Sequence, residues 1–495
     1  MSRAVTERVE VRRDDLVGEV ARLFAQRWRL GLVAAHEDED HLRVVYLFLR
    51  PVNQRRELVV AVARDDPWVP TLAGLSYPAG RFEREVRDLY GIRPHGHPLP
   101  YRMVRHGHWP TGWYPMLRGA DPTPRFERDI ASYPFVEVQG DGVYEIPVGP
   151  VHAGLIEPGH FRFSVVGETI LRMKARLWFV HRGVEKLFEG STPVEGMELA
   201  ERISGDTAVG HGLAYALAVE DAAGIEVDEQ SRIARALLLE LERLYNHVSD
   251  LGAIANDVGF GIAHAHTQRL REQLLRHNKS LTGHRLLRGG ITIGGARLAS
   301  LPDVALIRAV AQETAEIVGI TLDHPVVADR FSGTAVLAAQ QAEHLGVLGY
   351  VGRASGLAVD ARADHPFVHL DEAFVPAVEH TGDVRGRFVV RAREAAMSAS
   401  LVSALTGRLG GPTHARDQAQ GRTLAAAGVG VVEAWRGTLC HRVELDAEGR
   451  LSRVKVVDPS FFNWPALPVA LADTIVPDFP LANKSFNQSY AGNDL

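Results

Sequence analysis

Cysteine is almost absent from this sequence: Cys440 is the one cysteine among 495 residues. A single thiol cannot form an internal disulfide, and cysteine-based metal and iron-sulfur sites need two to four sulfur ligands. The chain therefore cannot hold a cysteine-ligated iron-sulfur cluster, and any such centre that it serves must belong to another subunit.

Long apolar runs are missing as well. Hydrophobic residues make up 46% of the chain, but no uninterrupted stretch approaches the roughly 18 to 20 residues that a membrane-spanning helix requires. The first thirty residues carry Arg, Asp and Glu throughout, without the apolar core and small-residue cleavage site of a secretory signal. We therefore expect a chain that is soluble by itself and cytoplasmic.

The charge balance is mild, and no phosphate-binding loop is present. A formal net charge of -6 argues against the strongly basic surface that binds nucleic acid. The glycine-rich segment GGITIGGARLAS, residues 289–300, lacks the Lys-Ser/Thr pair of a P-loop and the spacing of a dinucleotide turn. We therefore expect no nucleic acid partner and no nucleotide in such a loop.

The chain divides into two predicted regions joined by a linker. Residues 1–120 are predicted to form a small mixed α/β domain, with an amphipathic helix near residues 14–28 and the strand-like runs LRVVYLFLR and RELVVAVARD. Residues 121–145 are predicted to be a linker, because Pro, Asp and aromatic residues punctuate this part of the chain without a helical period. Residues 146–495 form the second region.

The second region is predicted to begin with strands and then to become mainly helical. VYEIPVGPVHAG and HFRFSVVGE are expected to be strands, and from about residue 192 apolar residues recur at the i, i+3, i+4 and i+7 spacing of bundled helices. Further helices are expected near residues 301–320, 335–350 and 385–406. We therefore predict an α+β fold, in which a small mixed α/β domain precedes a mainly helical domain with a small β-sheet at its start.

Several motifs resemble those of one family of respiratory subunits. FEREVRDLYGIRPHGHP, residues 82–98, is similar to the signature of the smaller peripheral subunit of complex I, which is often fused ahead of the large one. GPVHAGLIEPGHFRFSVVGE, residues 149–168, and HRGVEKLFEG resemble the opening of the large subunits of complex I and of energy-converting nickel-iron hydrogenases. HGLAYALAVE, ELERLYNH and the tail KSFNQSYAGNDL continue the resemblance in register, and the tail favours the hydrogenase-4 and formate hydrogenlyase branch.

The resemblance implies a place within a larger oxidoreductase. Large subunits of this family lie beside an iron-sulfur small subunit on a membrane arm of antiporter-like subunits, where electron transfer is coupled to proton or ion movement. We therefore expect a peripheral position on the cytoplasmic face of a membrane. The electron donor, whether formate, ferredoxin or NADH handled by another subunit, and the translocated ion stay open.

The relatives hold a nickel-iron centre with two Cys-x-x-Cys pairs, and this chain lacks all four thiolates. The first pair of ligand positions, in RISGDT, holds Ser204 and Thr207, and the second, in DPSFFN, holds Ser460 and Asn463. Hydroxyls and an amide bind soft metals far more weakly than thiolates do, so no nickel-iron centre and no other metal site is expected. We interpret the four as packing or capping residues; for Asp206, a helix cap and a proton carrier are both retained.

In complex I the same pocket receives a quinone headgroup, which a loop histidine and a tyrosine contact. The resemblance places His160 at the loop histidine and Asp257, in ANDVGFG, at the carboxylate that pairs with it, while the tyrosine position falls on Gly205. A histidine beside a carboxylate is a good proton donor to a reduced quinone, because the pairing raises its pKa. The sequence thus predicts a quinone pocket at His160 and Asp257, with a structural histidine in a β turn as the alternative.

Two further charged residues complete the set of catalytic candidates, Glu157, His160, Asp206, Asp257 and Arg436. Glu157, in LIEPGH, matches a proton-carrying position of the hydrogenase relatives, or is a solvated loop carboxylate. Arg436, in EAWRG, could stabilise negative charge in the pocket or form a structural salt bridge. Two functions stay open: a subunit that couples electron transfer from the iron-sulfur neighbour to quinone reduction or proton translocation, and a catalytically silent scaffold.

Overall fold

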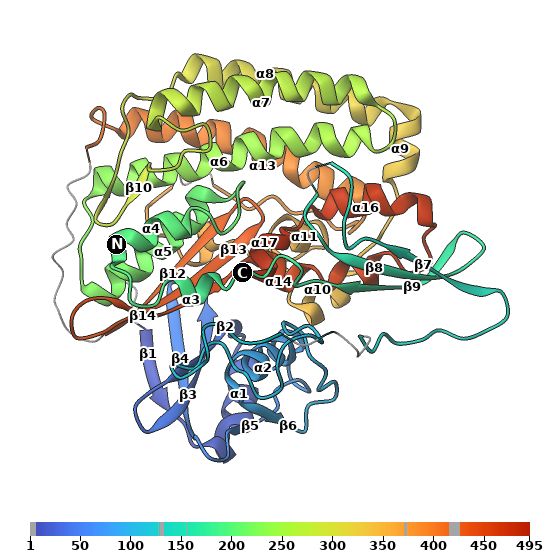
Figure 1. Cartoon of the computed structure of the whole chain (residues 1–495). Coiled ribbons are helices and arrows are strands. Elements are labelled where there is room, and N and C mark those ends of the chain that lie inside the picture. The colour runs from blue at the N-terminus through green and yellow to red at the C-terminus, as the bar shows by residue number, and fades with distance from the viewer. Residues whose placement is uncertain (1–5, 127, 129–132, 155, 371–373, 415–425) are drawn as a thin grey trace.

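The predicted combination of a mixed N-terminal domain and a mainly helical second region is confirmed. The computed structural model describes residues 6–126, 128, 133–154, 156–370, 374–414 and 426–495. Figure 1 shows the N-terminal sheet at one end of the molecule and a layer of long helices at the other, with a sheet from the C-terminal part between them. The central sheet thus lies between most of the helical layer and the N-terminal domain.

The N-terminal domain is built on a four-stranded sheet of order β1-β4-β3-β2, in which only β1 runs parallel to its neighbour. The expected helix is α1, whose Leu16, Val20 and Leu23 are buried at the spacing of one helical face. The elements are β1 (Thr6–Glu10), α1 (Leu16–Ala25), β2 (Arg29–Glu37), β3 (His41–Arg50), β4 (Gln54–Ala63), β5 (Trp68–Pro70), α2 (Tyr77–Tyr90) and β6 (Arg93–His95).

A three-stranded antiparallel sheet opens the second region, as expected from VYEIPV and HFRFSVV. It consists of β7 (Val143–Val148), β8 (His160–Val166) and β9 (Thr169–Arg176), in that order. Between β6 and β7 the described residues form neither helix nor strand. The loop that joins β7 to β8 carries Glu157 and reaches the candidate site.

Long helices α6, α7, α8 and α13 lie side by side as the outer layer in Figure 1. α5 lies beneath them, and nearly all of its side chains are buried. The predicted helix near residues 335–350 is instead two short helices, because the chain turns at Gly346, which adopts a positive φ of 66°. The elements are α5 (Ala208–Ala223), α6 (Glu229–Asn256), α7 (Gly261–Thr282), α8 (Val304–Asp323), α9 (Pro325–Phe331), α10 (Ala339–Leu345), α11 (Gly349–Ala354), α12 (Ala361–Asp364) and α13 (Val384–Arg408).

The central sheet, β12 (Ala426–Ala434), β13 (Gly437–Leu445) and β14 (Leu451–Val457), was not predicted. α5 lies directly on this sheet because β12 presents glycine to it. A Cβ atom at Gly430 would come within 1.9 Å of the Ala214 carbonyl oxygen of α5. At the N-terminal end of α5, a Cβ atom at Gly210 would come within 2.8 Å of the Ala434 Cβ, so this end lies against the turn between β12 and β13, where the candidate site forms.

Buried ion pairs join the N-terminal domain to the central sheet. Arg442 of β13 reaches the Glu57 carboxylate at 2.7 Å, and Lys455 of β14 reaches that of Glu85 at 2.7 Å. The remaining elements are α3 (Val184–Leu187), α4 (Pro193–Ala200), β10 (Ile291–Thr292), β11 (Gly295–Ala296), α14 (Pro459–Asn463), α15 (Ala466–Ala470), α16 (Phe479–Phe486) and α17 (Tyr490–Asp494). Within the described residues, no helix is both long and apolar enough to cross a membrane.

Candidate functional site

A cavity of about 510 Å³ lies where the β7–β8 loop, the turn before α5, the end of α6 and the segment of α16 and α17 meet. Four of the five predicted catalytic residues line it: Glu157, Asp206, Asp257 and Arg436. Glu157 and Arg436, which lie in distant parts of the sequence, are thus brought to one cavity. The cavity is the candidate site.

Asp206 and Arg436 form a two-point ion pair on the cavity wall. The Arg436 guanidinium donates from both terminal nitrogens to the two Asp206 carboxylate oxygens, each at 2.7 Å. Its Nε donates to the Asn487 carbonyl oxygen at 2.6 Å, and it lies 4.0 Å from the centre of the Trp435 ring. Burial alone would raise the pKa of Asp206, but the Arg436 charge and its hydrogen bonds lower it overall. The salt bridge retained for Arg436 is therefore present.

Asp206 does not cap α5. The backbone N–H groups of Val209 and Gly210, in the first turn of α5, donate instead to the Glu242 carboxylate at 2.7 and 2.9 Å. Burial raises the pKa of Glu242 to about 8. The capping interpretation of Ser204 and Asp206 is thus wrong, because a carboxylate from the neighbouring helix α6 takes that place.

At the first pair of positions where the resemblance places thiolates, both hydroxyls hydrogen-bond to the Asp206 carboxylate. Ser204 and Thr207 each donate to Asp206 Oδ1 at 3.0 Å, and Ser204 also contacts the Ser489 hydroxyl at 2.9 Å. Thr207 accepts from the Trp435 indole N–H at 3.1 Å. These side chains hold the Asp206 carboxylate in place.

At the second pair, Ser460 and Asn463 are fully buried in α14. Ser460 Oγ accepts from the Ser489 N–H at 2.9 Å. The Asn463 amide accepts from the Leu348 N–H at 2.8 Å and donates to its carbonyl oxygen at 3.1 Å. Both side chains therefore stabilise the packing of neighbouring segments, as the packing interpretation expects.

Glu157 and Asp257 differ in their hydrogen bonds and in their exposure to solvent. The Glu157 carboxylate accepts from the Ala491 N–H at 3.0 Å, in the first turn of α17. Asp257 follows the last residue of α6 and lies at the exposed rim of the cavity. Partial burial raises the pKa of Asp257, and the charges of Lys484 and His264 oppose this shift. Asp257 is thus more easily protonated than Asp206, whose pKa is lowered.

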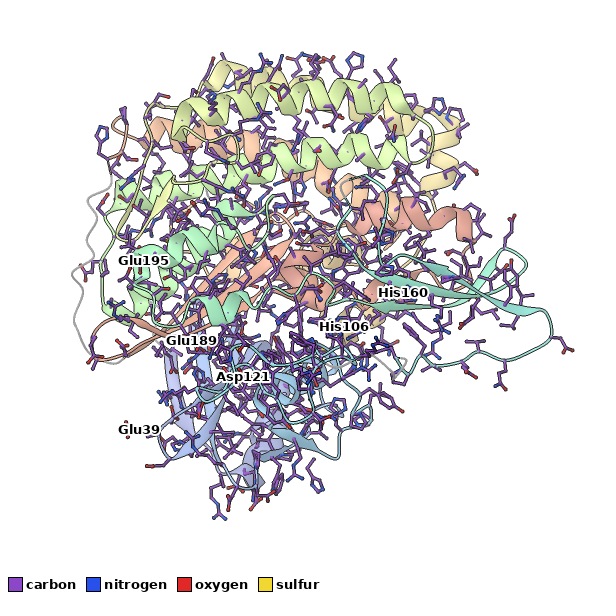
Figure 2. The ribbon with its side chains drawn as sticks, viewed as in Figure 1. Glu39, His106, Asp121, His160, Glu189 and Glu195 are labelled. Atoms are coloured by element: carbon purple, nitrogen blue, oxygen red, sulfur yellow. The ribbon has the colours of Figure 1, made fainter. Side chains whose placement is uncertain are left out.

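His160 lies outside the cavity, so the predicted pair with Asp257 does not form within the described residues. His160, labelled in Figure 2, is the first residue of β8. Its ring contacts the Gly149 carbonyl oxygen at 3.2 Å and packs on Phe135. The next residue, Phe161, lines the cavity. Because successive side chains of a strand point to opposite faces, His160 points away. His152, earlier in the same loop, lines the cavity instead.

The sequence reasoning missed the contribution of the C-terminal segment. Lys484, Asn487, Gln488, Ser489 and Tyr490, all within the tail motif, line the cavity. Burial raises the pKa of Tyr490 to about 12. Among the described residues its hydroxyl makes no hydrogen bond, although the Asn483 side chain lies nearby. The tail motif was the signal that could have identified these residues.

The described residues do not gather three His, Cys, Asp or Glu side chains closely enough to hold a metal ion. Cys440 is buried in β13, and burial raises the pKa of its thiol to about 12. It does not line the cavity. Cys440 is therefore not a side chain of the candidate site.

Three family models match successive parts of this chain. The 30 kDa subunit family of respiratory-chain NADH dehydrogenase matches residues 9–125. The nickel-dependent hydrogenase family matches residues 182–251, and the 49 kDa subunit family of respiratory-chain NADH dehydrogenase matches residues 257–428. The matches follow one another along the chain in the order that the motifs predicted.

The relatives agree with this assignment. The chain is 34% identical over 428 residues to formate hydrogenlyase subunit 5 of Escherichia coli (strain K12), covering 83% of this chain and 74% of the relative. It is 29% identical over 434 residues to the C/D subunit of the NADH-quinone oxidoreductase of Phocaeicola vulgatus, covering 81% and 82%. The chain therefore belongs to the family of large subunits of energy-converting hydrogenases and complex I.

A solved structure shares the fold. A chain of the membrane-bound sulfane sulfur reductase, an archaeal respiratory membrane complex, superimposes with a TM-score of 0.65 at 24% identity. The match covers 72% of this chain and 99% of that chain. At this level of identity the likeness is one of fold.

Proposed function

We propose that this chain is the large subunit of a membrane-associated, complex I-like oxidoreductase that works without a nickel-iron centre of its own. Its relatives include subunits of a formate hydrogenlyase and of an NADH-quinone oxidoreductase. In this proposal, electrons arrive from an iron-sulfur small subunit, and antiporter-like membrane proteins complete the assembly. The chain itself lies on the cytoplasmic face of the membrane.

The donor set at the four ligand positions does not fit nickel and iron. Those metals prefer thiolates in this family, whereas Ser204, Thr207, Ser460 and Asn463 offer neutral oxygen and nitrogen. All four side chains make hydrogen bonds within the fold. A metal at this position would have to break these bonds and would gain only weak ligands in return.

The cavity offers a quinone headgroup the contacts that its reduction needs, although from different residues than the resemblance implied. Tyr490 lines the cavity and carries the phenol that Gly205 cannot supply; in this proposal its buried hydroxyl turns towards the cavity to donate to a quinone carbonyl oxygen. The lowered pKa of Asp206 keeps it ionised and paired with Arg436, so this pair acts as a fixed polar contact. Asp257, whose pKa is raised, is the better proton carrier from the rim.

The observation that carries the quinone proposal is the buried Tyr490 hydroxyl in the cavity wall: Asn483 lies beside it, but no described residue makes a hydrogen bond of good geometry with it. Leaving such a group without a partner costs free energy, which a bound carbonyl oxygen would recover. We expect Tyr490→Phe to weaken quinone binding by about fivefold, the value of one neutral hydrogen bond of about 1 kcal/mol. The measurement is quinone-dependent turnover of the assembled complex as a function of quinone concentration.

A matched control is Tyr144→Phe, on the exposed part of β7, where the hydroxyl contacts the Gly167 carbonyl oxygen. This control should leave the quinone dependence unchanged. Equal quinone dependence in wild type, Tyr490→Phe and an Asp257→Asn variant would instead favour the scaffold function, which the hydrogen-bonded Ser460 and Asn463 support. Metal analysis tests the proposed lack of a nickel-iron centre. Stoichiometric nickel in the purified complex, assigned to this chain, would refute the proposal.

A further inference from the structure

A second cavity, of about 690 Å³, lies between α2 of the N-terminal domain, β9 and the α14–α15 segment. Four arginines line it: Arg81 and Arg84 from α2, and Arg172 and Arg176 from β9. No aspartate or glutamate is among the described residues of its wall. The wall therefore carries four positive charges and no negative one.

The two buried arginines are held by carbonyl oxygens and aromatic rings. Arg176 donates to the Met103 carbonyl oxygen and, at 2.8 Å, to that of Arg105, and its guanidinium lies 4.6 Å from the centre of the Tyr133 ring. Arg81 donates to the Asn493 side chain at 3.3 Å and lies 4.5 Å from the centre of the Phe461 ring. These contacts orient the guanidinium groups, while the carboxylates of Asp88 and Asp494 act on them only from outside the cavity wall.

The described residues supply no ion pair to Arg81 and Arg176, which are 8% and 4% exposed. Burial accordingly lowers the pKa of both to about 10. Buried charges are costly unless they are paired, and protein interiors normally pair them. The two arginines are thus built into the wall at a cost that an anion in the cavity would offset.

The two remaining arginines complete the wall on its accessible side. Arg84 donates to the carbonyl oxygens of Tyr101 and Arg102. The Arg172 side chain is exposed, and no hydrogen bond or ion pair joins it to the side chain of a described residue. Planar guanidinium groups bind carboxylates and phosphates at two points, and the volume is typical of small-molecule sites. We propose that this cavity binds a small anion that carries two or more phosphate or carboxylate groups.

The second cavity shares a wall with the first. Trp464 lines the arginine cavity, and its indole N–H donates to the Ser489 carbonyl oxygen at 3.1 Å. Its ring lies 4.8 Å from that of Tyr490, centre to centre, and both Ser489 and Tyr490 line the candidate site. An anion bound beside Trp464 would therefore lie one layer of side chains away from the candidate site.

The test is calorimetric titration of the purified full chain with inorganic pyrophosphate and, separately, with citrate. We expect saturable binding of at least one of them, with one site per chain and weaker affinity at higher salt concentration. Binding of pyrophosphate alone assigns phosphate as the recognised group, binding of citrate alone assigns carboxylate, and both results support the proposal. Absence of saturable binding for both anions would overturn it.

Arg172→Glu is the informative variant, because this side chain is exposed and its replacement removes no described contact of the folded chain. Charge reversal there should weaken binding by about tenfold or more, since one charge-assisted contact becomes repulsive. Arg308→Glu, on the exposed face of α8, makes the same change in net charge far from the cavity and should bind as wild type does. An equal loss in both variants would show that only net charge matters and would also overturn the proposal.

Discussion

The side chains of Asp206 and Arg436 should contribute a measurable coupling energy to stability. Single and double substitutions at the two positions measure it. In Asp206→Asn, the Arg436 side chain, which is 4% exposed, keeps neutral hydrogen-bond partners such as the Asn487 carbonyl oxygen and the more distant charge of Asp458. In Arg436→Met, the Asp206 side chain, which is 40% exposed, keeps the hydroxyls of Ser204 and Thr207 and gains contact with water. The two single changes therefore leave different charges behind.

The burial of each side chain sets the expected loss in the free energy of unfolding. Removing one partner of a fully buried pair costs about 3 to 5 kcal/mol. Because water reaches Asp206, we expect about 2 to 3 kcal/mol for Asp206→Asn and about 1 to 2 kcal/mol for Arg436→Met. The double variant should lose about as much as Asp206→Asn alone, so that the coupling energy is at least about 1 kcal/mol.

The assay is urea unfolding of the purified chain, followed by circular dichroism, for the wild type and the three variants. Glu313→Gln provides the control, because its pair with Arg269 lies on the surface, with side chains 37% and 46% exposed. Such pairs contribute at most about 1 kcal/mol, so the control should stay close to wild type. Single losses that add up fully in the double variant would refute the cooperative pair.

Three further predictions concern residues outside the cavity or behind it. Cys440 should react with a thiol reagent only after unfolding, because it is 2% exposed and burial raises its pKa to about 12; labelling of the native chain would contradict this. Gly349→Ala should destabilise the fold by about 2 kcal/mol or more, measured by urea unfolding, because an added Cβ would come within 1.8 Å of the Arg436 carbonyl oxygen. Burial lowers the pKa of His36 to about 4, below the unfolded value of 6.5, so the folded state binds fewer protons and stability falls as pH drops from 6.5 towards 4. His36→Phe should flatten this part of the pH profile of unfolding, and an unchanged slope would contradict the assignment.

The helices were predictable because their apolar residues repeat with the helical period, as in α1 and α6. The central sheet was not, and its burial explains why. Nearly every residue of β12 and β13 is buried, so no alternation of apolar and polar positions marks them as strands. Gly428 and Gly430 weaken the strand signal further, since only the packing of α5 shows what they are for.

For the candidate site, the sequence predicted which residues line the cavity better than it predicted which of them contact one another. Glu157, Asp206, Asp257 and Arg436 do line one cavity. The histidine transferred from the resemblance, His160, failed to reach it because the register of β8 decides which side chain faces inward, and local sequence does not fix that register against a distant segment. Contacts made by the C-terminal segment depend on the folded path of the whole chain, so they could not be predicted from local sequence either.

The ion pairs between the N-terminal domain and the central sheet have a consequence for how the chain could be cut. Glu57 with Arg442, and Glu85 with Lys455, hold together residues that lie on opposite sides of the segment before β7. A protease nick between the exposed Gly140 and Asp141 should therefore yield two fragments that still migrate as one particle on gel filtration. The covalent fusion would then serve mainly to deliver both halves in equal number.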